Sequence, residues 1–214
     1  MLVDPLSLRT PLAAFNGGLI VDPEMEVVEE RVIPDDLVAP IVGLLESSEL
    51  SVWVYGGANW YVRDLDGPHV AREASTVQFD PTLVSNYDNI RSVAKIVGVS
   101  DDHDAVARAA EDTRNHYGDD VSAARSQPYY LDVTHPLANK GAVVRFLSAK
   151  YEIPTDEIAT IGDMPNDVLM FAHSGLSIAM GNAGREVQRA ARRVTTTNDE
   201  DGFANAVDRF ILNS

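Results

Sequence analysis

The hydrophobic and polar positions of the chain follow two different rhythms. In the last third, short apolar runs alternate with segments of helical period, as in residues 158–161 followed by residues 168–173. This alternation is typical of a parallel sheet with helices on its faces. In the middle of the chain, strand-like runs form hairpins, as at residues 51–55 and 60–64, which are joined by Gly56-Gly57-Ala58-Asn59. The pattern predicts an α/β core interrupted by an α+β module.

The pattern of hydrophobic and polar positions changes near residues 22 and 135, and we take these positions as the predicted domain boundaries. We expect residues 1–22 and 135–214 to form the α/β core and residues 23–134 to form the inserted α+β domain. Residues 1–11, with Pro5 and Pro11 among them, are expected to form an irregular half-helix. The expected helices are 35–45, 69–76, 105–117, 140–150, 168–173, 184–192 and 201–212. The expected strands are 12–15, 19–21, 26–33, 51–55, 60–64, 93–99, 121–126, 129–133, 158–161, 177–180 and 193–196.

Composition removes several classes of function. The 214 residues carry a formal net charge of −16 and a sequence pI of about 4.5, which disfavours nucleic acid or an anionic membrane as a partner. The sequence has no cysteine, so disulfides and thiolate chemistry are excluded. No apolar stretch approaches the ~20 residues of a membrane span, and the first residues do not resemble a secretory signal. We expect a cytoplasmic protein that acts on a small molecule.

The most informative stretch is Thr160–Asp167, in which an apolar run is followed by Gly162 and then by a helical pattern. This order predicts a strand, a tight turn and a helix with Pro165 in its first turn. Asp163 and Asp167 then lie at the carboxyl end of a strand, where ligands bind in open α/β sheets. Two carboxylates so close together favour a bound cation, and hard oxygen ligands suit Mg²⁺. For this stretch alone, a turn with two helix-capping aspartates is an equally good interpretation.

Lys140 is the candidate phosphate ligand. It opens a predicted helix, and a helix N-terminus offers unpaired N–H groups and a partial positive charge that attract anions. Lys140 precedes Asp163 by 23 residues, enough for one helix, one loop and one strand, so both residues are expected at the same sheet edge. A solvent-facing lysine is the simpler interpretation of Lys140 taken alone. Gly181–Gly184 is expected to be a second strand-to-helix turn on the same edge, although an ordinary glycine turn is the accepted interpretation of this segment taken alone. Thr195–Gly202 is expected to be a solvated loop before the last helix.

Several blocks of sequence carry a family resemblance. They are Phe15–Gly18, Asn139–Gly141, Gly162–Asp167, Ser177–Ala183 and Asn198–Gly202. Together they resemble the haloacid dehalogenase-like (HAD) hydrolase superfamily, in its Cof-type phosphatase branch with a large inserted α/β cap. The resemblance is specific over the C-terminal third, whereas residues 23–134 resemble the family only in the order of their elements. It implies a Rossmann-like parallel-sheet core with an inserted α+β cap domain.

The resemblance also implies roles for individual residues. Lys140 is the basic residue that bridges the substrate phosphoryl group and an aspartate nucleophile, and Asp163 is the Mg²⁺ ligand. Asp167 supports the metal shell, and Asn16 and Asn166 contact the substrate. The implied chemistry is attack by an aspartate on a phosphate ester, followed by hydrolysis of the aspartyl-phosphate by water. Mg²⁺ and the lysine neutralise the charge on the transferred group.

One part of the family pattern is not found where it is expected. The family begins with a strand that ends in Asp-x-Asp, whose first aspartate is the nucleophile, and the residues before Phe15 contain no such motif. Asp64-Leu65-Asp66-Gly67 has the spacing but follows a hairpin, and we interpret it as a turn. The sequence resembles the family from the helix after the family's second motif onward. We therefore expect the chain as printed to be inactive or severely impaired.

The sequence is compatible with three functions. The first is a Mg²⁺-dependent phosphatase that acts on a small phosphorylated metabolite such as a sugar phosphate. The second is a non-catalytic relative that binds phosphate ligands or a protein partner, and the third is a phosphotransferase. A P-loop enzyme is disfavoured because its glycine-rich motif is not in the sequence. The hairpin residues Tyr55, Asn59, Trp60 and Arg63 are candidates for substrate selection, although packing within the sheet is the stronger interpretation for each.

Overall fold

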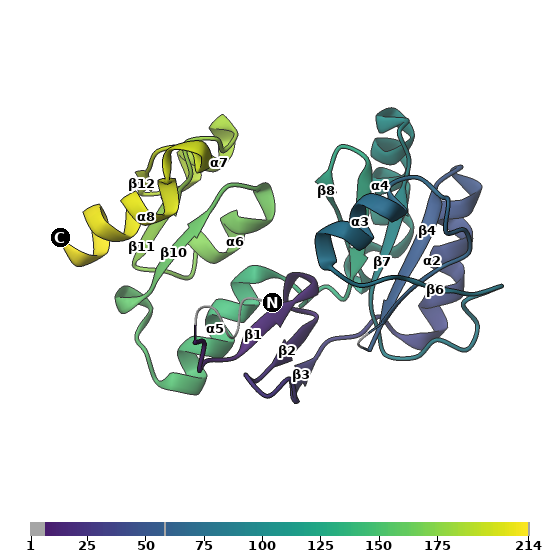
Figure 1. Ribbon diagram of the computed structural model, residues 1–214, viewed down its shortest axis with the longest axis horizontal. Helices are drawn as coiled ribbons and strands as arrows, with labels where there is room; N and C mark the ends of the chain where they lie inside the picture. The colour runs from purple at the N-terminus through teal and green to yellow at the C-terminus, as the bar shows by residue number, and fades with distance from the viewer. Residues whose placement is uncertain (1–6, 58, 214) are drawn as a thin grey trace. The chain divides into compact units, whose positions relative to one another are not determined.

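The computed structural model describes residues 7–57 and 59–213, and these residues form two compact units (Figure 1). The first unit is Met1–Ala138 and the second is Asn139–Ser214. Of the expected half-helix at residues 1–11, residues 1–6 lie outside the described part, and residues 7–11 form a turn, a bend and irregular backbone instead of helix.

A six-stranded sheet is the centre of the first unit. Its strand order is β6-β5-β4-β7-β9-β8, and all neighbours are antiparallel except the pair β5 and β6. The strands are β4 (Ser51–Gly56), β5 (Asn59–Val62), β6 (Thr82–Leu83), β7 (Val93–Val99), β8 (Ser122–Gln127) and β9 (Tyr130–Thr134). Within the described part of this unit, the α-helices are α2 (Asp35–Ser47), α3 (Val70–Val77) and α4 (His103–Tyr117).

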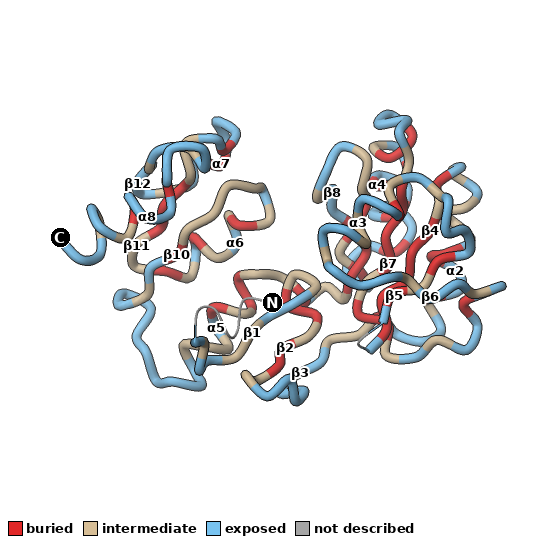
Figure 2. The backbone as a smooth tube through the Cα atoms, viewed as in Figure 1, coloured by how far each residue is buried: buried red, intermediate tan, exposed pale blue. Residues whose placement is uncertain are grey.

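The sheet buries side chains on both of its faces. Along β4, Val52 and Val54 belong to a large core that also includes residues of α2 and α4. Trp53 and Tyr55 alternate with them and belong to a second core, which includes Val70 of α3. This alternation is the two-residue period of a strand, and Figure 2 shows the buried positions gathered on β4, β7 and the facing helices. Both faces of β7 are covered, so all of its residues except the half-buried Lys95 are buried.

A second, smaller sheet of the first unit consists of β1 (Leu12–Ala14), β2 (Leu19–Val21) and β3 (Val27–Glu30), all antiparallel. Between β1 and β2 the chain turns through Phe15–Gly17, where Asn16 takes the left-handed conformation that asparagine tolerates (φ 58°). Because β3 pairs with β2, this sheet crosses residue 22, where the sequence pattern changes. The proposed domain boundaries at residues 22 and 135 remain a prediction.

The second unit contains the parallel sheet that the sequence predicts. β10 (Ala159–Gly162), β11 (Leu176–Ala179) and β12 (Arg193–Val194) are parallel neighbours in that order. Helices alternate with them, which confirms the predicted α/β class. They are α5 (Lys140–Tyr151), α6 (Val168–Phe171), α7 (Arg185–Ala190) and α8 (Gly202–Val207). Among the described residues, no helix is long and apolar enough to cross a membrane.

A few elements differ from the expectation. The closing helix is α8 followed by a π-helical turn at Asp208–Leu212, so it is not one continuous α-helix. Strand β12 has two residues instead of the expected four, and the short strand β6 was not expected. β6 is two residues long and exposed, so it has no alternating hydrophobic pattern that a sequence reading detects.

Candidate functional site

The site begins where two parallel strands of the second unit end. β10 ends at Gly162 and β11 at Ala179, and these two residues are direct partners in the sheet. Because parallel strands end at the same edge, the loops that follow them start side by side. The first loop brings Asp163 and the 3₁₀ turn Pro165–Asp167, and the second brings Asn182. The expected gathering of polar residues at one edge is therefore present.

Asp167 is the buried centre of the first loop. Its side chain is 3% exposed, and its Oδ2 atom accepts backbone N–H groups from Asp163 and Met164, both at 2.9 Å. Its Oδ1 atom accepts a hydrogen bond from the ammonium of Lys140. Charge-assisted bonds of this kind are the strong ones. The carboxylate therefore folds the loop around itself and binds the lysine.

Gly162 makes the inward position of Asp167 possible. A Cβ atom at Gly162 would lie 2.4 Å from the Cβ of Asp167, which no side chain tolerates. The close approach of backbone and carboxylate thus requires glycine at the end of β10. The sequence places the two aspartates four residues apart but does not show that one of them turns inward.

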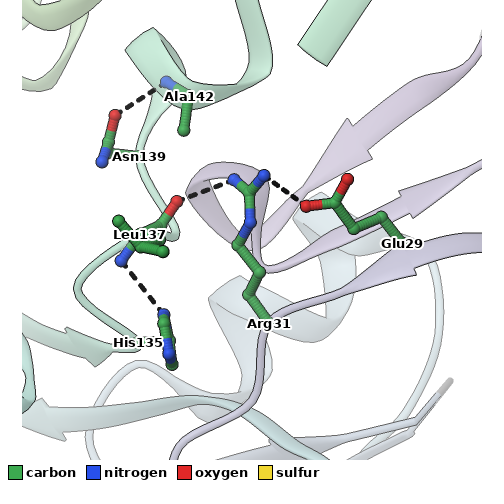
Figure 3. A network of polar contacts seen from close by, with 6 residues as sticks. All are labelled: Glu29, Arg31, His135, Leu137, Asn139 and Ala142. Atoms are coloured by element: carbon green, nitrogen blue, oxygen red, sulfur yellow. Dashed lines mark hydrogen bonds and ion pairs between the residues drawn. The ribbon is translucent and has the colours of Figure 1, made fainter. Parts of the chain in front are cut away.

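Lys140 reaches this carboxylate from the first turn of α5. Asn139 caps the helix, and its Oδ1 atom accepts the Ala142 N–H at 2.8 Å (Figure 3). The Lys140 side chain is 36% exposed, so only part of it is buried against Asp167. An ammonium has three donors, and the bond to Asp167 uses one of them. Lys140 is therefore fixed by Asp167 and can still meet an anion from solvent.

Asp163 is held differently from Asp167. Its Oδ2 atom accepts a hydrogen bond from Asn182 Nδ2 at 3.1 Å, and the Oδ1 atom of Asn182 accepts the Asn198 N–H at 3.0 Å. Asp163 is only half-buried. Three segments thus converge at this edge, each from a different strand end, and Asp163 is the carboxylate that faces outward.

The sequence placed Gly181–Gly184 at this sheet edge but did not show the contacts that the later loops make. Thr195–Gly202 was expected to be a solvated loop only. In the structure, Gly181 N–H donates to Thr196 O at 2.9 Å, and Asn198 reaches Asn182. A Cβ at Gly202 would lie 2.2 Å from Thr196 O. A glycine at the end of each segment was the available signal for such close packing.

The two predicted substrate-binding asparagines and the Asp-x-Asp sequence at residues 64–66 have different surroundings. Asn166 is half-buried in the same 3₁₀ turn as Asp167, and its role toward a substrate remains a prediction. Asn16 belongs to the first unit, and its role also remains a prediction. Asp64 and Asp66 are exposed, and Asp64 Oδ1 accepts the Asp66 N–H at 3.0 Å. The interpretation of that Asp-x-Asp as a turn is confirmed.

The predicted hairpin residues divide between core and surface. Tyr55 and Trp60 are 3% and 0% exposed, and their rings stack with centroids 5.9 Å apart. Arg63 is partly exposed and forms an ion pair with Glu46. For the two aromatic residues, packing within the sheet is therefore the correct interpretation.

The segment that leads out of the first unit has its own polar network (Figure 3). Arg31 donates to Leu137 O at 2.7 Å and forms an ion pair with Glu29. The Leu137 N–H donates to His135 Nδ1 at 3.0 Å, which requires a neutral ring nitrogen. Partial burial and the neighbouring Arg31 guanidinium lower the pKa of His135 below its ordinary 6.5.

Solved structures share this fold. A haloacid dehalogenase-like hydrolase from Bacteroides thetaiotaomicron matches with a TM-score of 0.85 at 27% identity, over 98% of this chain and 82% of that one. A HAD subclass IIB sugar phosphatase matches with a TM-score of 0.81 at 21% identity, over 97% and 78%. The fold is that of the HAD-like hydrolases.

Sequence comparisons place the chain in the same class. The family of haloacid dehalogenase-like hydrolases matches residues 2–207. A phosphatase-named protein of Haemophilus influenzae is 32% identical over 204 residues, which are 93% of this chain and 75% of that protein. A 5-amino-6-(5-phospho-D-ribitylamino)uracil phosphatase of Bacillus subtilis is 26% identical, over 98% and 81%. The chain belongs to the haloacid dehalogenase-like hydrolases, in their Cof-type branch, and its class is that of the phosphoric monoester hydrolases.

Proposed function

We propose that the site at the end of β10 serves a Mg²⁺-dependent phosphatase whose substrate is a small phosphorylated metabolite, a sugar or polyol phosphate. The observation that carries the proposal is the bond from Lys140 to the buried Asp167, because the same carboxylate accepts the Asp163 backbone N–H and so fixes an ammonium at the loop that carries Asp163. Relatives named as sugar or ribityl-phosphate phosphatases support the substrate class. A cytoplasmic location remains a prediction from the sequence.

The charges of the site support a cation. Asp167 balances Lys140, which leaves Asp163 as a net negative charge in a chain of net charge −16. A phosphate monoester is itself an anion and is repelled unless a cation is present. A bound divalent cation reverses the sign of the site and neutralises charge on the transferred phosphoryl group.

The site offers one carboxylate to a cation, which is compatible with Mg²⁺. Within residues 7–57 and 59–213, no three His, Cys, Asp or Glu side chains are grouped closely enough to hold a metal ion. Both oxygens of Asp167 already accept hydrogen bonds, so Asp163 is the carboxylate we assign to the cation and Asp167 a support for Lys140. Mg²⁺ commonly binds one or two carboxylates and fills its other positions with water and phosphate oxygens. We expect binding to be weak, because one carboxylate provides little affinity.

The chain's own residues then have distinct tasks. Lys140, at the N-terminus of α5, meets the phosphoryl oxygens with its remaining N–H donors. Asn166 meets the phosphoryl group or the leaving group. The family resemblance assigns the covalent step to an aspartate nucleophile, and we do not assign this role to Asp64 or Asp66, which form an exposed turn. We therefore expect little turnover from the printed chain.

A phosphate-release assay with Mg²⁺ tests the proposal. The proteins are the printed chain, the same chain extended by an in-frame strand that ends in Asp-x-Asp, and two variants of the extended chain. We expect release from sugar and polyol phosphates by the extended chain only. Lys140→Ala should remove most of it, by a factor of about 10² or more, whereas Lys150→Ala, at the exposed end of the same helix, should not.

Two results would contradict the proposal. Release by the printed chain that depends on Asp163 would mean that a nucleophile has been overlooked, with Asp64 and Asp66 the first to examine. An extended chain that folds and binds phosphate but releases none would favour the non-catalytic, ligand-binding alternative.

A further inference from the structure

Asn182 lies between the outward carboxylate of the site and a distant loop. Its Nδ2 atom is 3.1 Å from Asp163 Oδ2, and its Oδ1 atom is 3.0 Å from the backbone nitrogen of Asn198. The three residues follow three different strands of the parallel sheet. One side chain thus joins Asp163 to the loop before α8.

The direction of the amide follows from these partners. A backbone N–H only donates, so the atom of Asn182 that faces Asn198 has to be the oxygen. The NH₂ group is then the end that faces Asp163, and it can only donate to the carboxylate. The orientation of this amide is therefore fixed by chemistry, independently of how similar oxygen and nitrogen look in a structure.

The loop that sets this orientation is itself well held. Thr195 N–H donates to Ala179 O at 3.0 Å, and Thr197 and Glu200 form a reciprocal capping box at the start of the turn Asn198–Glu200. Gly202 packs against Thr196 O so closely that a side chain does not fit. The Asn198 N–H is thus presented by a constrained backbone.

We propose that Asn182 is a positioning residue that orients the Asp163 carboxylate toward the cation, and that the Asn198 N–H keeps Asn182 in its working orientation. The inference rests on the proposed function in one respect, the assignment of Asp163 as the cation ligand. Asn182 engages Oδ2 of Asp163, so Oδ1 is the oxygen that we assign to the cation. Removing a residue that hydrogen-bonds to a metal ligand typically weakens the affinity for the metal, because the ligand is then less well oriented.

The sharpest test removes a single N–H. Asn198 is the first residue of a 3₁₀ turn, where proline fits, and the preceding Thr197 has the extended ψ of 166° that a following proline prefers. Asn198→Pro therefore removes the donor and keeps the turn. Asn198→Ala is the matched variant, because it keeps the N–H and loses only a side chain that bonds to Asp199.

The measurement is cation affinity in the printed chain, by Mn²⁺ titration followed by electron paramagnetic resonance with Mg²⁺ as competitor. Asn198→Pro should weaken binding about three- to tenfold, the worth of one hydrogen bond, and Asn198→Ala should leave it unchanged. Equal affinities for these two variants would overturn the role of the N–H.

Two substitutions of Asn182 should act in opposite directions. Asn182→Ala removes the donor and should weaken Mn²⁺ binding by a similar factor. Asn182→Asp places a second carboxylate beside Asp163 and should tighten binding, because two carboxylates so close favour a cation between them. Unchanged affinity in both variants would overturn the inference. A printed chain that binds no cation while Asp163→Ala behaves identically would defeat the cation assignment within the proposed function and the inference with it.

Discussion

Each of the two units contains a lysine paired with a buried aspartate, and the two pairs are bonded very differently. In the parallel sheet of the second unit, Lys140 donates directly to Asp167, whose other oxygen accepts two backbone N–H groups. In the antiparallel sheet of the first unit, Lys95 and Asp132 are 3.6 Å apart, beyond a normal hydrogen bond. Asp132 Oδ1 is buried and accepts no hydrogen bond from the described residues.

The difference reflects where the two pairs are in their sheets. Asp167 is in a loop beyond a strand end, where backbone N–H groups are not used by the sheet and turn toward the carboxylate. Asp132 is in the middle of β9, where the backbone groups are committed to neighbouring strands. A loop can supply donors to a buried charge, whereas a strand interior cannot, which is one reason why functional charges are found at strand ends.

The largest loss of stability that we expect comes from substitution of Gly162, because this glycine leaves space for the Asp167 side chain that pairs with Lys140. In Gly162→Ala, the new Cβ would overlap Asp167, and the loop must open at a cost of about 3 kcal/mol. Hydrogen exchange of the β10 and β11 amides should show this loss. Gly43→Ala, in α2 of the first unit, is the matched control, since nothing lies within 4 Å of its Cβ, and it should stabilise by about 0.5–1 kcal/mol. Equal effects at the two glycines would show that Asp167 is not held against Gly162.

Replacing Asp167 or Asp132 with asparagine tests how much each lysine–aspartate pair contributes to stability. Asp167→Asn turns an NH₂ group toward either the Lys140 ammonium or the backbone N–H groups, so a donor always faces a donor. With Lys140 partly exposed, we expect a loss of about 2 kcal/mol in the second unit. Asp132→Asn has no close hydrogen bond to lose and should cost about half as much. Urea denaturation followed by far-UV circular dichroism would measure both, and a larger loss for Asp132→Asn would reverse the comparison.

Much of the fold was predictable from the sequence because it depends on periodicity. The helix at Lys140 and the strands at Ala159 and Leu176 have clear patterns, and the glycine and aspartates between them indicated the site. What the sequence did not show is orientation. Asp163 and Asp167 are the same type of residue, and Asp167 is held inward by the space at Gly162 together with the N–H groups of Asp163 and Met164. Contacts such as Asn182 with Asn198 join distant segments and leave no local pattern.

The N-terminus of the helix that carries Lys140 is a further determinant of how the Lys140–Asp167 pair is held. Asn139→Ala removes the bond from Asn139 Oδ1 to the Ala142 N–H, and loss of such a cap typically costs about 1 kcal/mol. The first turn of α5 should then fray, which loosens Lys140 but leaves Lys95 unaffected in the middle of β7. Faster amide exchange confined to the start of α5 is the expected result. Asn139→Ser keeps a capping oxygen and should restore most of the protection; failure to do so would mean that Asn139 acts in some other way.

The smallest expected effect is the pH dependence of stability that His135 gives to the first unit. In the native state, burial and Arg31 disfavour the protonated form of His135 and lower its pKa below 6.5, while neutral Nδ1 accepts the Leu137 N–H. The unfolded chain therefore binds this proton more readily, and stability rises with pH. The contribution is complete above pH 6.5 and is lost as the pH falls through the lowered native pKa; since His135 is partly exposed, it amounts to less than about 1 kcal/mol.

Thermal melts of the first unit measure this pH effect. Both tryptophans, Trp53 and Trp60, are in that unit, so their emission reports its unfolding alone. His135→Asn keeps a side-chain acceptor near the position of Nδ1 but does not titrate. The difference in melting temperature between wild type and His135→Asn should shift against the wild type on going from neutral to mildly acidic pH. A difference that is constant with pH would show that His135 does not contribute to the acid sensitivity of this unit.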